Sequence, residues 1–458
     1  MKPLLKHTLA WTSSPWGRGV MVLLLLTLAS GLSRTPAGLA ALAAALLLGY
    51  ANPRLGLMLL FGSAFLPYVW GLPVTAGFVV IIALLPSLLV GWRETLSHMP
   101  RQLAMLLALL FALIIATYPF HKPIDLELLA LGLIGLSQAL LFASRSTARA
   151  THIVLDLGLA LTAVLFLPLI TNSILGWHSP FWLPSHLGDM LLGRVAVGVT
   201  ELNMLGAYVA AVYAVYLFCA RLRGRSRSFH LLYVLLGLVL LFSLNAIGSR
   251  AAMAMAGLVT LAALALAYTK ARAGQDSQMH CWRSVRFAAA STVLMIVLVF
   301  SVATAAAGSG PKGIIRLLET AGMEETGRPK SFRDAADRLD SVPLAGFDLE
   351  EYVSNVAHHT PHSSLAAGLL FLGLFVSLAL YALLLFPVYD TLLGSRLSEA
   401  PVFGVGLLTL LATTLAIPLT SDRGMLVLLG VWFAYSKLPR LGDAAVATRR
   451  RIAPSVPV

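Results

Sequence analysis

The sequence predicts an all-α protein, a polytopic membrane helix bundle with 12–14 transmembrane helices. Of its 458 residues, 58% are hydrophobic and 12% are charged, and the mean hydropathy is +0.85. Soluble proteins are about 45–50% apolar and about 25% charged. Apolar runs of nearly membrane-spanning length also follow one another along the whole chain. These observations exclude a soluble enzyme, a disordered chain and a collagen-like chain.

Fourteen apolar runs are candidate transmembrane helices, because crossing about 30 Å of hydrocarbon takes roughly 20 residues. They are 18–33, 36–51, 55–71, 74–92, 102–118, 125–143, 152–171, 200–219, 229–247, 251–269, 286–307, 365–387, 401–419 and 423–437. Several early runs are short, and separators such as Asn52-Pro53 are small, so twelve spans is the alternative. No internal repeat is visible.

The net charge of +13 is interpreted as membrane topology rather than as nucleic-acid binding. With the N-terminus inside, alternate loops hold 22 of the 33 Lys and Arg residues, and six of the other 11 lie in one long loop. Cytoplasmic loops collect basic residues, whereas long translocated loops escape this bias. We therefore expect both termini in the cytoplasm and Cys219 and Cys281 reduced near that face. Asp156, about one turn into its run, is expected to face the same side.

The runs and loops divide the chain into four parts. Residues 1–171 form the N-terminal helices, and 172–307 form central helices with a Trp/His/Pro-rich outer loop. Residues 308–364 form a large outer loop, and 365–458 form the C-terminal helices and a basic tail. Two amphipathic stretches in the large loop, one with apolar residues spaced i, i+3, i+4, i+7, predict short helices on the membrane surface.

Arginines lie beside apolar runs on the outer side, against the positive-inside trend, at Arg194, Arg250, Arg328 and Arg423. The guanidinium fork binds phosphate oxygens bidentately. Together, Arg194, Arg250 and Arg328 predict a site for a lipid-borne phosphate or pyrophosphate. The alternative for each one alone is contact with lipid headgroups or with a nearby acid, as Arg423 has in Asp422.

Histidines close the large loop at His358, His359 and His362. A neutral imidazole accepts a proton from an attacking hydroxyl near neutral pH. His362 precedes the next apolar run, so it is the first candidate for a general base, and His359 is the second.

Metal binding is a weaker interpretation of the same region. Three imidazoles are zinc ligands in principle, but Pro361 interrupts helical spacing and no cysteine is near. The acid pairs Asp125/Glu127 and Asp348/Glu350 imitate sites for a divalent ion, yet such short patterns are more often solvated acids. We therefore expect no metal.

Pro361-His362-Ser363, with Gly373 eleven residues after the histidine, resembles the His-Asn/Ser-x9-Gly signature of the bacterial O-antigen ligase family. That family is related to O-antigen polymerases and pilin O-oligosaccharyltransferases. Gly327-Arg328 and Val342-Pro343-Leu344-Ala345-Gly346 resemble the preceding segment, and Gly248-Ser249-Arg250 resembles the outer turn. Arg194 with Glu201-Leu202-Asn203 resembles the Arg…Pro-Asn segment, although Glu201-Leu202 departs from its usual pattern. The resemblance covers roughly residues 190–390.

The resemblance implies a GT-C-like, inverting glycosyltransferase of the bacterial inner membrane with its active site facing the periplasm. It moves a polysaccharide from undecaprenyl pyrophosphate to lipid A-core among membrane lipids, without a cofactor, a metal or nucleic acid. The implied catalytic base is His362, and the implied pyrophosphate ligands are Arg194, Arg250 and Arg328. The residues that orient substrate are expected to be Asn203, His359, Arg333 and Arg423.

Other functions remain open at this point. A polymerase or a protein O-oligosaccharyltransferase of the same family uses the same donor with another acceptor. A lipid or glycan transporter is the alternative from another class. Transporters place charged or broken-helix sites near the bilayer midplane, often with internal repeats, whereas charges inside these runs are rare.

Overall fold

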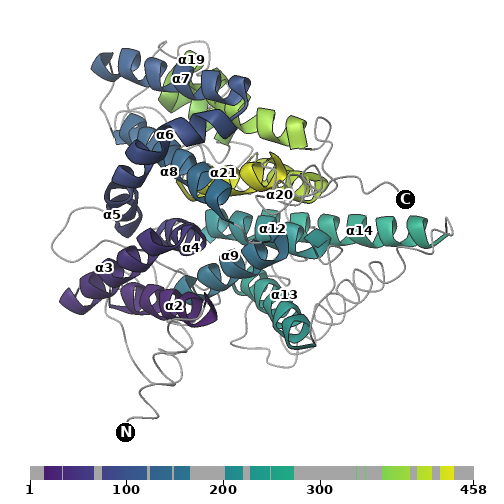
Figure 1. The fold of residues 1–458 in the computed structure, drawn as a ribbon. Helices are drawn as coiled ribbons and strands as arrows, with labels where there is room; N and C mark the ends of the chain where they lie inside the picture. The colour runs from purple at the N-terminus through teal and green to yellow at the C-terminus, as the bar shows by residue number, and fades with distance from the viewer. Residues whose placement is uncertain are drawn as a thin grey trace, which may run out of the picture.

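The computed structural model describes residues 15–32, 35–66, 75–120, 124–146, 149–165, 202–219, 227–247, 249–272, 337, 346, 364–391, 400–414 and 423–437. These residues form helices that lie side by side, and no strand occurs among them (Figure 1). The all-α prediction is confirmed for this part of the chain.

The helices, labelled as in Figure 1, are α2 Pro15–Gly31, α3 Pro36–Ala51, α4 Pro53–Ser63, α5 Ala76–Ala83, α6 Leu85–His98, α7 Arg101–Thr117, η1 Tyr118–Phe120, α8 Ile124–Arg145, α9 Ala150–Leu165, α12 Leu202–Cys219, α13 Arg227–Ile247, α14 Arg250–Arg272, α19 Ser364–Tyr389, α20 Ala400–Thr414 and α21 Arg423–Lys437. Each predicted apolar run that falls on described residues coincides with one of them or with the bent pair α5–α6. The run 286–307 and the two amphipathic stretches lie outside the described residues. The four-part division of the chain stays a prediction.

Two of the described helices are long and apolar enough to cross a membrane alone, over Leu126–Arg145 of α8 and Ala367–Tyr389 of α19. The pair α5–α6 passes the same test only as one unit with a bend of 57°. The shorter apolar helices found in these ranges have 10–17 residues. Length and composition therefore support two spanning helices, or three if the bent pair is one span.

Two Xaa-Pro pairs set the boundaries of the early helices. The Thr35 hydroxyl accepts a hydrogen bond from the N–H three residues later at 3.3 Å, and the Asn52 side chain accepts one from the N–H two residues later at 2.9 Å. Pro36 and Pro53 then take the first helical position, where a missing N–H is tolerated. These two boundaries divide the apolar stretch from Pro15 to Ser63 into α2, α3 and α4.

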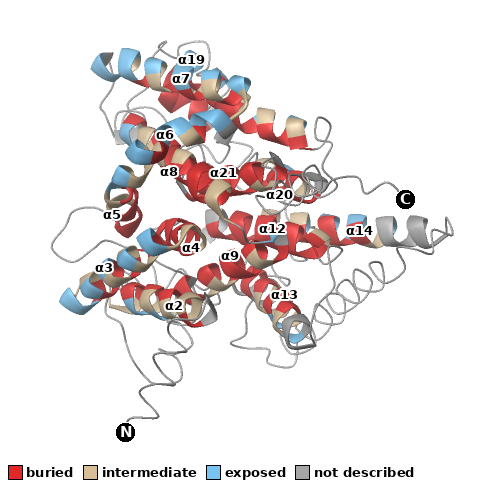
Figure 2. Ribbon diagram, viewed as in Figure 1, coloured by how far each residue is buried: buried red, intermediate tan, exposed pale blue. Residues whose placement is uncertain are grey.

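α12 lies at the centre and contacts α9, α13, α14 and α20 (Figures 1 and 2). Its side chains are buried from Leu205 to Leu217, as expected for a helix that is hydrophobic on all sides. The Tyr213 hydroxyl lies 3.1 Å from the Thr260 hydroxyl of α14, so the two polar tips satisfy each other inside the core.

α2, α4 and α9 run in the same direction. The Ser30 hydroxyl in α2 donates to the Val164 carbonyl in α9 at 3.0 Å, close to the ends of both helices. Arg54 and Asp156 pair near the starts of α4 and α9. A Cβ on Gly62, near the end of α4, would lie 3.5 Å from Val164. These helices correspond to the first, third and seventh predicted runs. Consecutive spans alternate in direction, so odd-numbered runs are expected to be parallel to one another.

α6, α8 and α21 also run parallel to one another. A Cβ on Gly135 of α8 would lie 3.1 Å from Val427, and one on Gly430 of α21 would lie 2.7 Å from the Leu136 carbonyl oxygen. Small residues at both contacts let the two backbones approach closely. α6 packs along α8 in the same direction. Gly91 of α6 lies against Leu141 of α8, and farther along both helices Glu94 pairs with Arg145.

α12 and α21 run in the opposite direction to α4. Phe65, just past the end of α4, contacts Tyr208 near the start of α12, with 5.1 Å between ring centroids. A Cβ on Gly56, near the start of α4, would lie 3.2 Å from Phe142, near the end of α8, and α21 runs parallel to α8. α12 therefore begins, and α21 ends, at opposite ends of α4, in agreement with the predicted alternation of helix direction.

The bend between α5 and α6 is stabilised by side chains from two other helices. Pro86 in the first turn of α6 lacks an N–H and interrupts the helical hydrogen bonds. The Gln138 amide of α8 donates to the Ile81 carbonyl at 2.7 Å, and the Tyr50 hydroxyl of α3 donates to the Ala83 carbonyl. Unpaired carbonyls are costly in an apolar environment, so these donors make the bend a stable feature of the fold.

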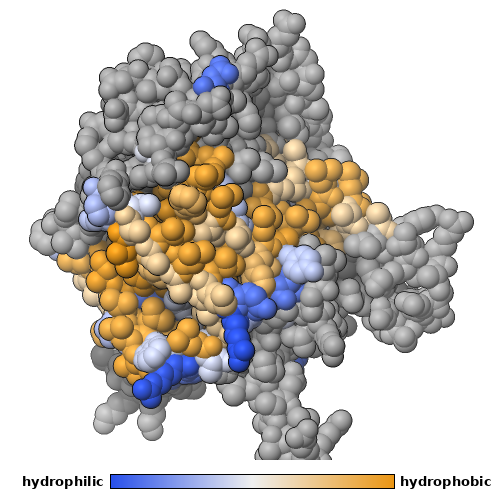
Figure 3. Space-filling view, turned by 90° about the horizontal axis from the view of Figure 1, so that it is seen from above, coloured by the Kyte–Doolittle hydropathy of each residue, from blue (hydrophilic) through white to orange (hydrophobic). Residues whose placement is uncertain are grey.

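The outward faces of the described helices are largely apolar. Leu47 of α3, Val90 of α6 and Ile115 of α7 are 73%, 85% and 73% exposed, and Figure 2 shows exposed positions along the outer sides of these helices. On the side where α7 and α19 lie, hydrophobic residues cover much of the described surface (Figure 3). Soluble proteins rarely expose apolar surface this extensively, whereas lipid contact accounts for it.

Asp156 is buried in an ion pair with Arg54, and the expectation that it lies toward the cytoplasmic side stays a prediction. Arg54 Nη2 donates to Asp156 Oδ1 at 2.7 Å, and Arg54 Nε donates to the other carboxylate oxygen. The two side chains are 27% and 7% exposed. The pair joins α4 to α9 where an isolated charge would be strongly unfavourable. Arg54 was counted among the basic residues of the expected inner side. The structure shows that it also forms an ion pair that joins two helices.

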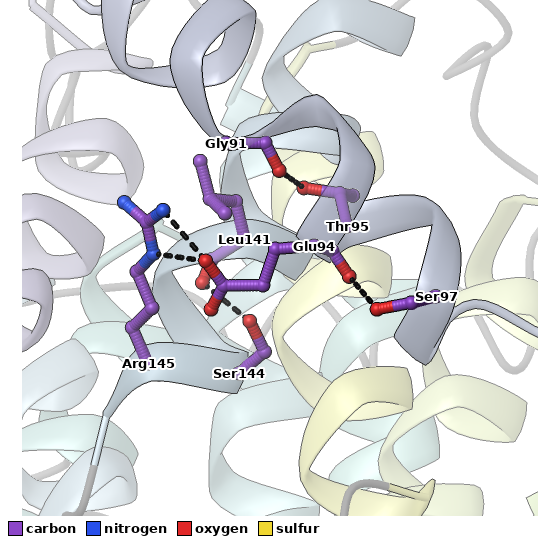
Figure 4. Close-up of polar contacts among 7 residues, drawn as sticks. All are labelled: Gly91, Glu94, Thr95, Ser97, Leu141, Ser144 and Arg145. Atoms are coloured by element: carbon purple, nitrogen blue, oxygen red, sulfur yellow. Dashed lines mark hydrogen bonds and ion pairs between the residues drawn. The ribbon is translucent and has the colours of Figure 1, made fainter.

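A second ion pair joins α6 to α8 nearer the surface (Figure 4). Arg145 Nη2 and Nε both donate to Glu94 Oε2, at 2.7 and 3.0 Å. The side chains are 34% and 39% exposed. Water screens such a pair, so its contribution to stability is small.

We expect the free energy of unfolding to respond very differently to the two pairs. Asp156→Asn leaves the Arg54 charge without its counter-charge, and breaking a buried pair costs about 3–5 kcal/mol. The partial exposure of Arg54 places the loss at the lower end of that range. Glu94→Gln is the matched control, with an expected loss of about 0–1 kcal/mol. Thermal unfolding of both detergent-purified variants measures the difference, and equal shifts would contradict the role given to Arg54 and Asp156.

Candidate functional site

Three candidate site residues lie in the first turns of described helices. Asn203 follows the first residue of α12, and Arg250 and Arg423 begin α14 and α21. The structure describes the backbone of these three positions. The other candidates lie outside the described residues: Arg194, Arg328, Arg333, His359 and His362.

The starts of α12 and α14 are in contact. A Cβ on Gly206, in the second turn of α12, would lie 2.6 Å from Ser249 Cβ and 3.0 Å from Ala252 Cβ. Only glycine permits this approach without a shift of the backbones. The contact between Tyr213 and Thr260 lies farther along both helices. α12 and α14 are therefore parallel, and Asn203 and Arg250 share one end of the bundle.

α21 begins at the same end as α12, because both helices run opposite to α4. The fold thus brings three candidate residues to one end of the bundle: Asn203, Arg250 and Arg423. The first and the last of them are 220 residues apart in the chain. The Arg54–Asp156 pair lies at the other end, where α4 begins.

The starts of α12, α14 and α21 are local positive sites at this shared end. The first four N–H groups of a helix have no partner within it, and the helix dipole adds about half a positive charge at the N-terminus. α13 ends at Ile247, directly before α14, and α4 also ends on this side, so negative helix ends lie there as well. A helix start binds a phosphate group through its own N–H groups, and each of these three starts is therefore a possible contact for an anionic ligand.

α19 is broken at the glycine of the predicted signature. Gly373 has φ 74° and ψ 173°, which interrupts the helix. Gly346 also has a positive φ, 89°, and a Cβ on it would lie 2.6 Å from the Phe371 carbonyl oxygen and 2.7 Å from Gly373 N. Two segments that the family resemblance assigns to one site, the end of 342–346 and the residues after His362, therefore meet at this break.

The break lies inside an apolar helix. Phe371 and Gly373 are buried, and lipid cannot satisfy the backbone groups that a break releases. Irregular backbone in such a helix is tolerated where other protein segments cover it or where it lines a cavity. Gly346 supplies part of that cover, so the large loop is anchored to α19 at this point.

We expect Gly346→Ala to destabilise the protein strongly. A positive φ costs an L-residue about 1–2 kcal/mol, and the added methyl would overlap the α19 backbone. Gly257→Ala is the matched control, since nothing lies within 4 Å of a Cβ at this α14 position and alanine favours the helix by up to about 1 kcal/mol. Thermal unfolding compares them, and a neutral Gly346→Ala would remove the anchoring role.

Metal ligands are not gathered in this part of the chain: the described residues contain no group of three His, Cys, Asp or Glu that could hold a metal ion. Glu127, one of the acids considered for a divalent ion, accepts a hydrogen bond from the Tyr118 hydroxyl at 3.0 Å. The pair Asp348/Glu350 and the three loop histidines lie outside the described residues.

The sequence analysis missed the Ser249 hydroxyl. Ser249 precedes α14, and its carbonyl accepts the first helical hydrogen bond, from Met253 N–H at 3.0 Å. The residue is 1% exposed, and its Oγ has no hydrogen-bond partner among the residues that the structure describes. The available signal was a serine directly before a helix, the usual capping position.

No family model and no curated protein sequence matches this chain. The function is therefore argued from the residues and from the geometry of the helix starts.

Proposed function

We propose that this chain is a polytopic, GT-C-like membrane glycosyltransferase with 12–14 spans. In this proposal it transfers polysaccharide from undecaprenyl pyrophosphate to lipid A-core at the periplasmic face of the bacterial inner membrane, with both termini in the cytoplasm. The observation that carries the proposal is the common location of the starts of α12, α14 and α21, with Asn203, Arg250 and Arg423 in their first turns. Helix starts and guanidinium groups are both ligands for a diphosphate.

The proposed donor site is cationic. Arg194, Arg250 and Arg328 bind the pyrophosphate and stabilise the charge that grows on it as the bond between sugar and phosphate breaks. Lipid-linked pyrophosphate then departs as the leaving group. Because pyrophosphate is a good leaving group, the reaction does not require an acid catalyst. The family resemblance implies that it needs no metal.

The proposed acceptor chemistry uses one imidazole. The acceptor hydroxyl oxygen forms the new bond to the anomeric carbon on the face opposite the departing phosphate, which inverts the configuration. His362 takes the hydroxyl proton. Ser364 begins α19 two residues after His362, so the break and its anchor at Gly346 lie close in sequence to the base. The residues proposed to orient substrate are Asn203, His359, Arg333 and Arg423.

A strain that lacks this gene tests the function and its nearest alternatives. Loss of the whole lipopolysaccharide ladder, with accumulation of lipid-linked glycan, is the result expected for the ligase. One repeat retained on the core would indicate the polymerase, and an intact ladder with loss of protein glycosylation would indicate the O-oligosaccharyltransferase. An intact ladder with unchanged protein glycosylation would contradict all three.

We expect His362→Ala to abolish ladder formation in that strain at normal expression. Loss of a general base typically lowers the rate by about 10²–10⁴-fold. His358→Ala is the matched control from the same loop and should restore the ladder. Gels of lipopolysaccharide from the two complemented strains make the comparison, and a near-normal ladder with His362→Ala would exclude this residue as the base.

A transporter of lipid-linked glycan is the second candidate, because two apolar helices are discontinuous. The chain bends at Leu84 between α5 and α6, eight residues after Ala76, and it breaks at Gly373 in α19, nine residues after Ser364. At 1.5 Å per residue, both lie about 12–14 Å from the helix start. Transporters bind substrates at such breaks.

Proteoliposomes distinguish the two candidates. The purified protein is supplied with lipid-linked glycan on one side of the bilayer and with lipid A-core on the other or on both. A covalent product on lipid A-core supports the transferase. Glycan that crosses the bilayer without a new covalent bond supports the transporter and excludes the proposed enzyme.

A further inference from the structure

Arg93 lies on the outward face of α6. Two residues along a helix turn through about 200°, so Arg93 is on the side of the helix opposite Gly91 and Thr95, which are buried. A Cβ on Gly91 would lie 2.8 Å from Leu141, so the buried side is the one that packs on α8. Arg93 itself is exposed. Its position is therefore directed away from the bundle.

The surface around Arg93 is apolar. Leu89 and Val90, one turn before it, are 64% and 85% exposed, and Leu96, one turn after it, is 47% exposed. The bent pair α5–α6 is apolar and long enough to cross a membrane as one unit. Exposed apolar surface of this kind marks contact with lipid, and a charge at its border needs a partner.

The protein supplies no acidic partner for Arg93 in the part of the chain that the structure describes. The adjacent Glu94 is paired with Arg145. The guanidinium group of Arg93 is a fork of N–H donors that matches phosphate oxygens. Its natural partner is therefore an anion that approaches α6 from the lipid side.

Trp92 holds the guanidinium group in place. Arg93 Cζ lies 5.7 Å from the centroid of the Trp92 ring, which is a cation–π distance. Trp92 is 50% exposed, and tryptophan is enriched where a membrane meets water. This residue pair therefore combines a ring suited to the level of the lipid headgroups with a cation suited to their phosphates.

We infer that Trp92 and Arg93 form a binding site for the headgroup phosphate of an anionic phospholipid, with its acyl chains along Leu89 and Val90. A lipid with net negative charge is favoured, because basic residues at a membrane surface attract anionic lipids. The inference goes beyond the proposed function: it requires that the α5–α6 pair lies in a membrane, but it does not require transfer of a glycan.

Native mass spectrometry of the delipidated, full-length protein in detergent tests this site, with equal amounts of phosphatidylglycerol and phosphatidylcholine added. We expect the unmodified protein to retain phosphatidylglycerol in preference to phosphatidylcholine. Arg93→Gln should lower the affinity for phosphatidylglycerol about fivefold or more, because a basic residue at the headgroup level is lost. Trp92→Leu keeps an apolar side chain without the ring and should also weaken this binding.

Arg18→Gln in α2 is the matched control. It removes the same charge on the same predicted side of the membrane, but Arg18 is half-buried one turn before the buried Val22. This variant should bind phosphatidylglycerol like the unmodified protein. A thermal unfolding scan of each variant without added lipid reports on folding.

Three results would each overturn the inference. They are no preference for phosphatidylglycerol in the unmodified protein, an unchanged preference in folded Arg93→Gln, and an equal loss in Arg18→Gln, which would show that net charge alone attracts the lipid. The readout is lipid binding, whereas the transferase is tested by the lipopolysaccharide ladder. Failure of one proposal therefore leaves the other standing.

Discussion

Every backbone N–H and C=O in an apolar bundle needs a partner, since neither lipid nor aliphatic side chains can supply one. Most of the described chain meets this constraint by being helical, and its departures from helix show the constraint at work. Where α5 gives way to α6, Gln138 and Tyr50 donate to the released carbonyls of Ile81 and Ala83. Where α19 breaks at Gly373, the backbone of Gly346 closes against it. Both breaks are therefore specified by residues distant in sequence.

Close parallel packing has electrostatic consequences at one end of the bundle. Gly206, Gly135 and Gly430 allow neighbouring helices to pack closely, and several of these neighbours run in the same direction. The starts of α12, α14 and α21 lie there beside the ends of α4 and α13. Each of these helix starts can contact an anionic ligand through its own N–H groups, whichever of the two proposed activities the ligand serves.

The two ends of the bundle carry their charges for different reasons. At the end where α4 begins, Arg54 and Asp156 neutralise each other and join two helices. At the opposite end, Arg250 and Arg423 begin α14 and α21, where helix N-termini favour an anion. The first charges are therefore structural, and the second end is the one that we propose to bind a ligand.

The helix positions could be predicted from sequence because apolar runs and their Pro and Asn boundaries are local features: Thr35-Pro36 and Asn52-Pro53 end and begin helices through caps within a few residues. The side of the membrane that the basic residues indicate for each loop stays a prediction. The sequence could not reveal that Asp156 pairs with Arg54, that Ser249 lies against Gly206, or that Gly346 meets Gly373. These contacts depend on which helix is the neighbour and how closely it approaches, and that is decided by side-chain fit between segments up to 102 residues apart, the separation of Arg54 and Asp156.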